Sequence, residues 1–220
     1  MHLDNSQTSA LIQAFLAENA KLNLSAFRTE EHCRIGNIQD SLTILDHVKP
    51  EMIMRVADLG TGGGFPLLPL AMAMPHSTFV GIDSIDKKVQ AVRRITAAVS
   101  LTNVTVLSGR IEEIAQRPDM RGTFDLVTAR ALAPLAVLLE YAMPLLKVGG
   151  TAAFWKSTKI ADELASTAEA QKTLRCAYSH TFTYTLPGDW GDRCIVFFQK
   201  KADTPEAYPR KTGTPKSDPL

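Results

Sequence analysis

Residues 55–66 read RVADLGTGGGFP, a short apolar run that ends in an acid and is followed by four glycines in five positions. Glycines this dense after a strand-like segment let another group approach the backbone closely. The run is not a Walker A sequence, because no Gly-Lys-Ser/Thr closes it. It is a poor dinucleotide fingerprint as well, since the pattern from Gly60 is G-x-G-x-G and the sixth position is Phe65. An acid before such glycines suits a cofactor that carries a cation rather than a pyrophosphate.

Short apolar segments alternate with helical patterns on either side of this run. The predicted strands are residues 53–58, 78–83, 104–108, 124–129 and 151–155, and the predicted helices are residues 66–74, 86–99, 134–146 and 160–173. Regular alternation of this kind predicts a parallel sheet with helices on both faces. Two more candidate strands, 177–186 and 193–199, have only a Pro-Gly-Asp-Trp-Gly turn between them, so they should form an antiparallel hairpin at one sheet edge. The predicted fold class is therefore α/β, with a Rossmann-like, mostly parallel sheet.

Periodicity and composition divide the chain into three regions. Residues 1–50 have helical periodicity, with Leu11 and Phe15 on one face, and should form an N-terminal helical cap. Residues 51–200 contain the predicted sheet and should form the cofactor-binding domain. Residues 201–220 form a basic, proline-rich tail that we expect to be extended or loosely ordered.

Charge and cysteine content narrow the class of protein. The net charge is +1, so no global positive field indicates nucleic-acid binding, although local basic patches are compatible with it. The three cysteines, Cys33, Cys176 and Cys194, are too widely spaced to indicate a disulfide framework or a zinc site. The first residues include an acid and no apolar signal segment, and the most apolar stretch is too short to cross a bilayer. We therefore expect a soluble cytoplasmic protein with no membrane segment, and the scattered histidines predict no metal.

An acid and three glycines form the first candidate ligand site. Asp58 ends the first predicted strand, and Gly60, Gly62 and Gly64 follow it. Open α/β sheets bind ligands at the carboxyl ends of their strands. The segment 58–64 resembles the first motif of class I methyltransferases, which use S-adenosylmethionine. The glycines would let this cofactor lie against the main chain, and Asp58 would supply negative charge near its ammonium and sulfonium groups.

Asp83, at the end of predicted strand 78–83, is the candidate acceptor for both ribose hydroxyls. An acid at this position does not distinguish S-adenosylmethionine from NAD, because both contain a ribose. The structural alternative is a role at the start of the next helix, together with Ser84. For the glycine run, the corresponding alternative is a tight turn without a ligand. The missing third dinucleotide glycine favours S-adenosylmethionine.

The end of the fourth strand, which usually faces the cofactor's methyl group, reads TARALAP from Thr128. Amino-group methyltransferases typically carry Asn or Asp there, followed by Pro-Pro and an aromatic residue. Cytosine-C5 enzymes need a nucleophilic cysteine beside the cofactor, and none of the three cysteines ends a predicted parallel strand. Arg130 in this position suggests an acceptor that already has a free lone pair.

The wider pattern of motifs covers nearly the whole chain. It comprises NLSA at 23–26, DSL at 40–42, the stretch 58–69, Asp83-Ser84, RIEE at 110–113, TARA at 128–131, KVGG at 147–150 leading to Lys156, and RKTGTP at 210–215 through Leu220. This combination resembles the RsmG (GidB) family, bacterial methyltransferases that modify guanine N7 in the 530 loop of 16S rRNA. It is far more specific than the glycine run alone. Two positions depart from the expected pattern: Asn37 replaces a histidine and Ser25 replaces a threonine.

The resemblance implies a class I methyltransferase fold, S-adenosylmethionine as methyl donor, and 16S rRNA as substrate, within the small ribosomal subunit or a precursor. We interpret the reaction as in-line methyl transfer without a general base, with Arg130 as the catalytic residue that positions the guanine. The implied cofactor-binding residues are Asp58, Gly60, Gly62, Gly64, Phe65, Asp83, Ile111, Glu112 and Arg130. The implied RNA-binding residues are Arg110, Lys156, Arg193, Arg210 and Lys211. We expect a monomer.

Two other classes of function remain open from the sequence. A nicotinamide oxidoreductase would need a dinucleotide glycine pattern and a hydride-transfer pair such as Tyr-Lys, and neither is evident. A noncatalytic ribosome-assembly factor could retain the cofactor pocket without turnover, because N7 chemistry leaves no nucleophile or base to search for. For Arg130 itself, the structural alternative is a surface salt bridge with Glu112 or Glu113.

Overall fold

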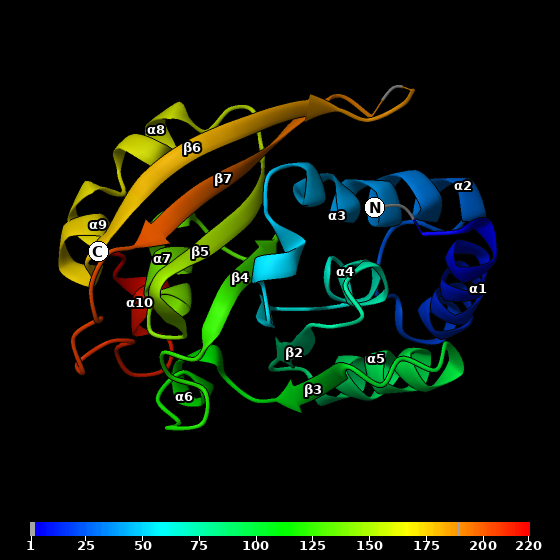
Figure 1. Cartoon of the computed structure of the whole chain (residues 1–220), viewed down its shortest axis with the longest axis horizontal. Coiled ribbons are helices and arrows are strands. Elements are labelled where there is room, and N and C mark those ends of the chain that lie inside the picture. Colours follow the sequence, from blue (N-terminus) through cyan, green and yellow to red (C-terminus); the bar gives the residue numbers. More distant parts are fainter. Residues whose placement is uncertain (1–2, 189) are drawn as a thin grey trace.

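Strand β1 (Arg55–Leu59) is an internal strand of the sheet in the computed structural model, which describes residues 3–188 and 190–220. It is an almost wholly buried run, as expected of a parallel strand covered on both faces. The other strands are β2 (Thr78–Asp83), β3 (Val104–Ser108), β4 (Phe124–Arg130), β5 (Leu146–Ser157), β6 (Cys176–Thr185) and β7 (Asp192–Lys200). Within the described residues they form one sheet in the order β3-β2-β1-β4-β5-β7-β6 (Figure 1).

Strand directions confirm the predicted α/β, Rossmann-like fold. The pairs β1–β2, β1–β4, β2–β3 and β4–β5 are parallel, whereas β7 runs antiparallel to both β5 and β6. The predicted antiparallel hairpin at the sheet edge is therefore confirmed. The strand order reverses at β1, whose neighbours β2 and β4 lead away in opposite directions. The carboxyl ends of these strands form the crevice where open α/β sheets bind ligands.

Helices cover both faces of this sheet (Figure 1). One face packs against α1 (Asn5–Leu22), α2 (Glu30–Cys33), α3 (Asp40–Leu42), α4 (Leu67–Ala73) and α5 (Asp86–Ala98). The other packs against α6 (Ile111–Ile114), α7 (Leu135–Ala142), α8 (Ala161–Ala165), α9 (Ala168–Leu174) and α10 (Thr214–Ser217). Alternation along the strands explains the two layers, because consecutive residues such as Val56 and Ala57 point into opposite cores. In the described ranges, none of these helices is both long and apolar enough to cross a membrane.

The N-terminal cap is helical over most of its length, as predicted. Helix α1 begins at a capping box, in which the Asp4 carboxylate accepts the backbone N–H of Gln7 at 2.7 Å. Beyond α2 the cap continues through a π-helical segment (Arg34–Gln39), α3 and two 3₁₀ turns (Thr43–Asp46 and Pro50–Met52). Phe15 of α1 meets Phe65 edge-to-face, with ring centroids 5.0 Å apart. The cap therefore packs directly against the loop that follows β1.

The predicted helix at 160–173 is two helices, α8 and α9. Between them, the hydroxyl of Ser166 donates to the carbonyl oxygen of Glu163, and the hydroxyl of Thr167 donates to that of Leu164. Hydroxyl side chains that bond to nearby carbonyls compete with the helical ladder, which explains the interruption. Periodicity alone did not reveal the break, because the apolar spacing continues across it.

The C-terminal tail, residues 201–220, is ordered, so the expectation of an extended or loose segment is wrong. Arg121 donates to the backbone carbonyl oxygens of Thr204, Pro205 and Tyr208, at 2.7 to 3.0 Å. The tail then ends in the short helix α10. Proline-rich composition does not by itself predict a loose segment, because prolines also lower the conformational entropy of the unfolded chain and so favour an ordered state. In addition, the residues that bind the tail lie far away in the sequence.

Candidate functional site

A cavity of about 260 Å³ opens at the carboxyl ends of β1, β2 and β3, and we call it the edge cavity. It lies in the predicted crevice and is slightly smaller than the roughly 300–1,000 Å³ of typical small-molecule sites. Four of the predicted cofactor-binding residues line it: Gly60, Asp83, Ile111 and Glu112. The remaining lining residues are Ser84, Ile85, Lys88, Gly109, Arg110, Ala131, Leu132, Ala133, Tyr141 and Lys216.

Backbone geometry explains the glycines of the loop after β1. Gly60 and Gly62 have φ angles of +62° and +56°, a left-handed conformation that strains other residues. A Cβ on Gly62 would meet only the carbonyl oxygen of Gly60, at 3.7 Å, so open space lies beside the backbone there. A Cβ on Gly64 would instead collide with Leu68 at 2.5 Å. Gly62 therefore leaves room for a ligand, whereas Gly64 is needed for packing.

Asp83 fixes the same loop from the end of β2. Its Oδ2 accepts the N–H of Gly62 at 2.9 Å, and its Oδ1 accepts the N–H of Ile85 at 2.9 Å. The second bond agrees with the structural alternative of a role at the start of α5. Each carboxylate oxygen can accept a further hydrogen bond, and the side chain borders the edge cavity. Both roles, loop support and ribose recognition, are therefore compatible with this geometry.

Asp58 is buried at the end of β1 and is only 1% exposed. The Thr128 hydroxyl donates to its Oδ1 at 2.8 Å, whereas its Oδ2 is buried without a hydrogen-bond partner among the residues described. Burial raises the pKa of Asp58 to about 6, although the hydroxyls of Thr61 and Thr128 act in the opposite direction. A buried, unpaired carboxylate oxygen next to the glycine loop fits a cationic group of a ligand. The residues present therefore fit S-adenosylmethionine.

Glu112 joins the edge cavity to three other segments and is 3% exposed. Its Oε1 accepts from the Arg110 guanidinium at 3.2 Å, from the Tyr141 hydroxyl at 3.4 Å and from the N–H of Gly213 at 2.9 Å. Burial alone would raise the pKa of Glu112, but the bonds from Gly213 and Arg110 hold it below its usual value. Glu112 is thus ionised at neutral pH and ties α6 to α7 and to the tail.

Membership of the edge cavity differs in part from the sequence prediction. The predicted cofactor-binding residues outside its lining are Asp58, Gly62, Gly64, Phe65 and Arg130. Arg110, predicted to bind RNA, also lines this cavity. Tyr141 and Lys216 line it without having been predicted. Tyr141 gave no signal within an apolar helix, and the only signal for Lys216 was its position directly after the RKTGTP motif.

A second hollow, of about 440 Å³, lies at the carboxyl ends of β4 and β5, and we call it the arginine cleft. It is lined by Asp40, Arg130, Ala131, Trp155, Lys156, Ser157, Tyr184, Trp190, Asp192 and Arg193. The predicted residues Arg130, Lys156 and Arg193 therefore meet in one place. Lys156 donates to Glu163 at 2.5 Å, and the guanidinium of Arg193 lies 5.9 Å from the centre of the Trp190 ring.

Arg130, at the end of β4, is held in position by the N-terminal cap. Its guanidinium donates to Asp40 Oδ2 at 2.9 Å, to Asn37 Oδ1 at 2.7 Å and to a backbone carbonyl of the cap at 2.9 Å. A salt bridge with Glu112 or Glu113 is wrong as the structural alternative, because the carboxylate partner is Asp40. The side chain remains 18% exposed in the arginine cleft. Arg130 is therefore a cation fixed in orientation that can still contact a ligand.

Asp40 is the centre of this arrangement, and its side chain is completely buried. Its Oδ1 accepts from the Tyr184 hydroxyl at 2.6 Å, and the Arg193 guanidinium lies 3.5 Å from its Oδ2. Burial, followed by the charge of Asp40, raises the pKa of Tyr184, so the phenol stays neutral and donates. The sequence did not identify Asp40 as a site residue. Its only signal was the DSL motif.

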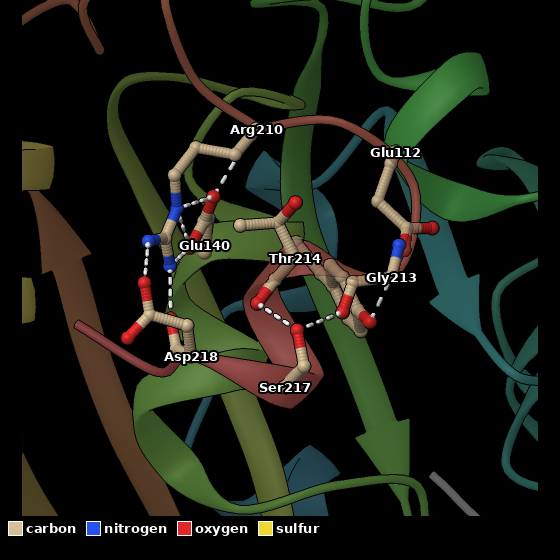
Figure 2. A network of polar contacts seen from close by, with 8 residues as sticks. Glu112, Glu140, Arg210, Gly213, Thr214, Ser217 and Asp218 are labelled. Carbon is tan, nitrogen blue, oxygen red and sulfur yellow. Dashed lines mark hydrogen bonds and ion pairs between the residues drawn. The ribbon is translucent and has the colours of Figure 1, made fainter.

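The two tail residues predicted to bind RNA have different environments. Arg210 donates to both carboxylate oxygens of Glu140, with Nε–Oε1 at 3.0 Å and NH2–Oε2 at 2.7 Å (Figure 2). Glu140 is completely buried. Arg210 also donates to the backbone oxygen of Asp218 at 2.7 Å. Lys211 is exposed to solvent. The structure therefore gives Arg210 an anchoring role, while Lys211 presents its charge at the surface.

The edge cavity and the arginine cleft meet at Ala131, which lines both. Ala131 has a φ of +53°, a left-handed conformation that turns the chain sharply after β4. This conformation costs an alanine on the order of 1–2 kcal/mol. A group bound in one hollow can thus face a group bound in the other. Nowhere in the described ranges do three or more His, Cys, Asp or Glu side chains gather in a way that could hold a metal ion.

Comparisons with known proteins agree with this geometry. The family model described as rRNA small subunit methyltransferase G (GidB) matches residues 4–186. Ribosomal RNA small subunit methyltransferase G of Exiguobacterium sp. is 37% identical over 215 residues, which are 98% of this chain and 90% of that protein. The protein of the same name from Deinococcus radiodurans is 38% identical over 214 residues, 97% of this chain and 85% of that protein.

Among solved structures, an O-methyltransferase from Bacillus cereus in complex with SAH has a TM-score of 0.64 against this chain. The match covers 91% of this chain and 93% of that one. At 15% identity it shows a common fold. The resemblance carried by the sequence motifs is confirmed by the family model and by the two relatives, and the chain belongs to the rRNA small subunit methyltransferase G family.

Proposed function

We propose that this protein transfers the methyl group of S-adenosylmethionine to N7 of a guanine in the 530 loop of 16S rRNA. The observation that carries the proposal is the junction of the edge cavity and the arginine cleft at Ala131. Family membership supports a small-subunit rRNA as the substrate. In this proposal the edge cavity binds the methyl donor, and the arginine cleft binds the nucleotide that accepts the methyl group.

S-adenosylmethionine supplies, when bound, a methyl group attached to a positively charged sulfur. On the protein side, Asp83 accepts from the ribose hydroxyls while its bond to Gly62 holds the loop open. Ile111 and Glu112 border the adenine, beyond the end of β3. Asp58 contributes negative charge at the end of β1, from a buried Oδ2 that has no hydrogen-bond partner among the described residues. These residues bind and orient the donor without taking part in proton transfer.

The residues of the arginine cleft orient the guanine rather than activate it. N7 carries an in-plane lone pair at neutral pH, so no proton has to leave before attack and no general base is required. Arg130 donates to guanine O6 or to a flanking phosphate, while Asp40 and Asn37 keep its guanidinium in position. Orientation of two reactants can contribute about 7–11 kcal/mol in the best cases. Burial raises the pKa of Cys33 to about 11 and that of Cys176 to about 12, so neither supplies a thiolate.

Aromatic and cationic side chains of the arginine cleft suit an unpaired nucleotide. Trp155 and Trp190 line the same hollow as Lys156 and Arg193. Sequence-specific RNA recognition favours unstacked bases in loops, where aromatic rings stack on the base and cations meet the phosphates. A stable duplex that contains the same guanine should therefore be a poor substrate.

The experiment that tests the proposal is mapping of N7-methylguanine in 16S rRNA from cells with and without this protein. The expected result is one modified guanine in the 530 loop, which disappears with the gene. In single-turnover assays, the Arg130→Ala variant should methylate at least tenfold more slowly than the parent protein. Its affinity for S-adenosylmethionine should stay close to that of the parent.

A matched control is Arg175→Ala, which removes an exposed arginine at the end of α9 that lines neither hollow. This variant should methylate at the parent rate. An unmodified 530 loop in cells that express the parent protein would contradict the proposed reaction. Ribosome-assembly defects in cells that lack the protein, without any difference in methylation, would favour the noncatalytic assembly factor.

A further inference from the structure

The C-terminal tail reaches the edge cavity through Lys216. After β7 the tail leads to α10, which packs beside α7 (Figure 1). Figure 2 shows the two anchors of this path, Arg210 on Glu140 and the N–H of Gly213 on Glu112. The first anchor is a bidentate pair with a buried carboxylate, a geometry that is specific as well as strong.

Both anchors connect to the wall of the edge cavity. Glu112 lines the cavity and accepts from Gly213 of the tail. Glu140, which accepts from Arg210, is followed on α7 by Tyr141. Tyr141 also lines the cavity and donates to Glu112. The residues that dock the tail are thus the same residues, or their immediate neighbours, that shape the cavity.

One residue of the tail lines the cavity directly. Lys216 lies on α10, three residues after Gly213. The turn is held together internally, because the Ser217 hydroxyl donates to the Gly213 carbonyl at 3.2 Å and Asp218 N–H donates to the Thr214 carbonyl at 2.9 Å. Arg210 closes this turn by donating to the backbone oxygen of Asp218. Lys216 is therefore presented from a fixed turn.

We propose that segment 210–218 is a wall of the methyl-donor site and that the Lys216 ammonium donates a hydrogen bond to the adenosine part of the bound donor. This inference rests on the proposed function. It assigns the adenosine part because Lys216 shares the cavity with residues that follow β3, such as Ile111 and Glu112, beyond the ribose acceptor Asp83. Adenine ring nitrogens and ribose oxygens are acceptors, and a lysine ammonium carries three donors.

Donor binding and tail docking are then linked. A ligand that contacts only the docked tail stabilises that docked state by RT ln(1 + c/Kd) at free ligand concentration c, so the stabilisation grows with the ligand concentration. Conversely, undocking of the tail lowers the affinity of the protein for the ligand. Neither Arg210 nor Gly213 needs to touch the donor for this effect, because they act through the position of Lys216 and Glu112.

Calorimetry with S-adenosylhomocysteine on the full chain tests the lysine contact. Lys216→Met keeps most of the aliphatic stem and removes the charge, and it should weaken binding about five- to tenfold, as expected for a partly exposed charge-assisted hydrogen bond. Lys216→Arg should recover part of the affinity. The matched control is Lys201→Met, which removes an exposed lysine from the same tail outside the cavity lining and should bind as the parent does.

Limited trypsin digestion, read by mass spectrometry, tests the linkage without any activity measurement. Saturating S-adenosylhomocysteine should slow release of the peptide that begins at Thr212 at least fivefold in the parent and much less in Lys216→Met. Equal affinities for Lys216→Met and Lys201→Met, with digestion unaffected by the ligand, would overturn the inference and leave the proposed function intact. A parent protein that binds no S-adenosylhomocysteine would overturn the proposed function, and the inference with it.

Discussion

The N-terminal cap and the C-terminal tail are each fixed to the sheet domain by a pair of a buried carboxylate and an arginine. The cap supplies the carboxylate of its pair, whereas the tail supplies the arginine. The cap brings the carboxylate of Asp40 to Arg130 of β4, at 2.9 Å. The tail brings Arg210 to the carboxylate of Glu140 on α7, at 2.7 Å. Both carboxylates are fully buried. The first pair borders the arginine cleft, and the second supports the edge cavity.

This exchange of charges separates two uses of arginine. Arg130 is one of several donors around Asp40 and keeps an exposed face in the arginine cleft. Each guanidinium nitrogen of Arg210 donates to Glu140 or to Asp218. Residue type alone therefore predicts neither role. The source of the carboxylate and the exposure that remains decide whether such an arginine contacts the substrate or anchors a segment.

The largest effect is expected for Arg210→Ala. Removal of the arginine leaves Glu140 as a buried carboxylate without its cation, and loss of one partner of a buried pair typically costs about 3–5 kcal/mol. We expect lower stability in urea unfolding and an undocked tail that trypsin cleaves quickly after Lys211. Addition of Glu140→Gln to Arg210→Ala should restore more than half of the loss. An equal loss in the single and the double variant would assign the effect to packing rather than to charge.

A third buried carboxylate, Asp58, sharpens the comparison because it accepts a hydrogen bond from the Thr128 hydroxyl rather than from an arginine. Burial raises its pKa from 3.8 to about 6. The folded protein therefore binds more protons than the unfolded chain between these values, and its stability falls as the pH rises through this window. Asp58→Asn should remove that fall and stabilise the ligand-free protein at pH 7.5 by about 3 kcal/mol.

Urea unfolding of the parent and Asp58→Asn at pH 4.5 and at pH 7.5 measures this difference. The variant should be more stable than the parent by about 1 kcal/mol at the lower pH, where part of the titration window has been passed, and by about 3 kcal/mol at the higher one. The variant should also bind S-adenosylhomocysteine about tenfold more weakly, since the site loses its negative charge. Parallel stability profiles for the two proteins would contradict the assigned titration.

Sequence patterns predicted most of the sheet because its strands are short apolar runs bounded by polar turns. Strands β2 and β3 begin and end at the predicted residues, and Arg130 ends β4 as expected. The glycine run and Asp83 also lie where the alternation of strands and helices put them. These features depend on local sequence and on a sheet topology with few alternatives.

The contacts that connect distant segments were not predicted. Asp40 lies 90 residues before Arg130, and no local pattern links the two. The anchor between Arg210 and Glu140 spans 70 residues and made a proline-rich tail ordered against expectation. Such pairs depend on where the finished fold places each segment, and a single sequence does not contain that information in its periodicity.

Asp40→Asn should separate the two kinds of arginine pair by activity rather than by stability. An amide in place of the carboxylate removes the negative charge that pairs with Arg130 and turns an NH₂ group toward either Arg130 or Tyr184, so the orientation of Arg130 is less firmly fixed. We expect about a tenfold lower single-turnover methylation rate, with affinity for S-adenosylhomocysteine within twofold of the parent. Tyr184→Phe, which leaves the pair with Arg130 intact, should lose less than threefold. Equal losses in both variants would mean that Arg130 does not depend on Asp40.

The smallest effect is expected at Lys211, the neighbour of Arg210. Its side chain is exposed, so Lys211→Ala should change stability by less than about 0.5 kcal/mol. If its ammonium meets one RNA phosphate, the slope of log affinity against log salt should become shallower by about 0.7, the value for one contact to a single strand. Filter binding of a 530-loop RNA at several salt concentrations measures the slope, with Lys201→Ala as the control from the same tail. An unchanged slope would show that Lys211 is not in contact with RNA, and the same change in both variants would show only a general charge effect. A shallower slope for Lys211 alone would mean that two adjacent basic residues divide the work of the tail, because one holds it to α7 and the other extends it toward the substrate.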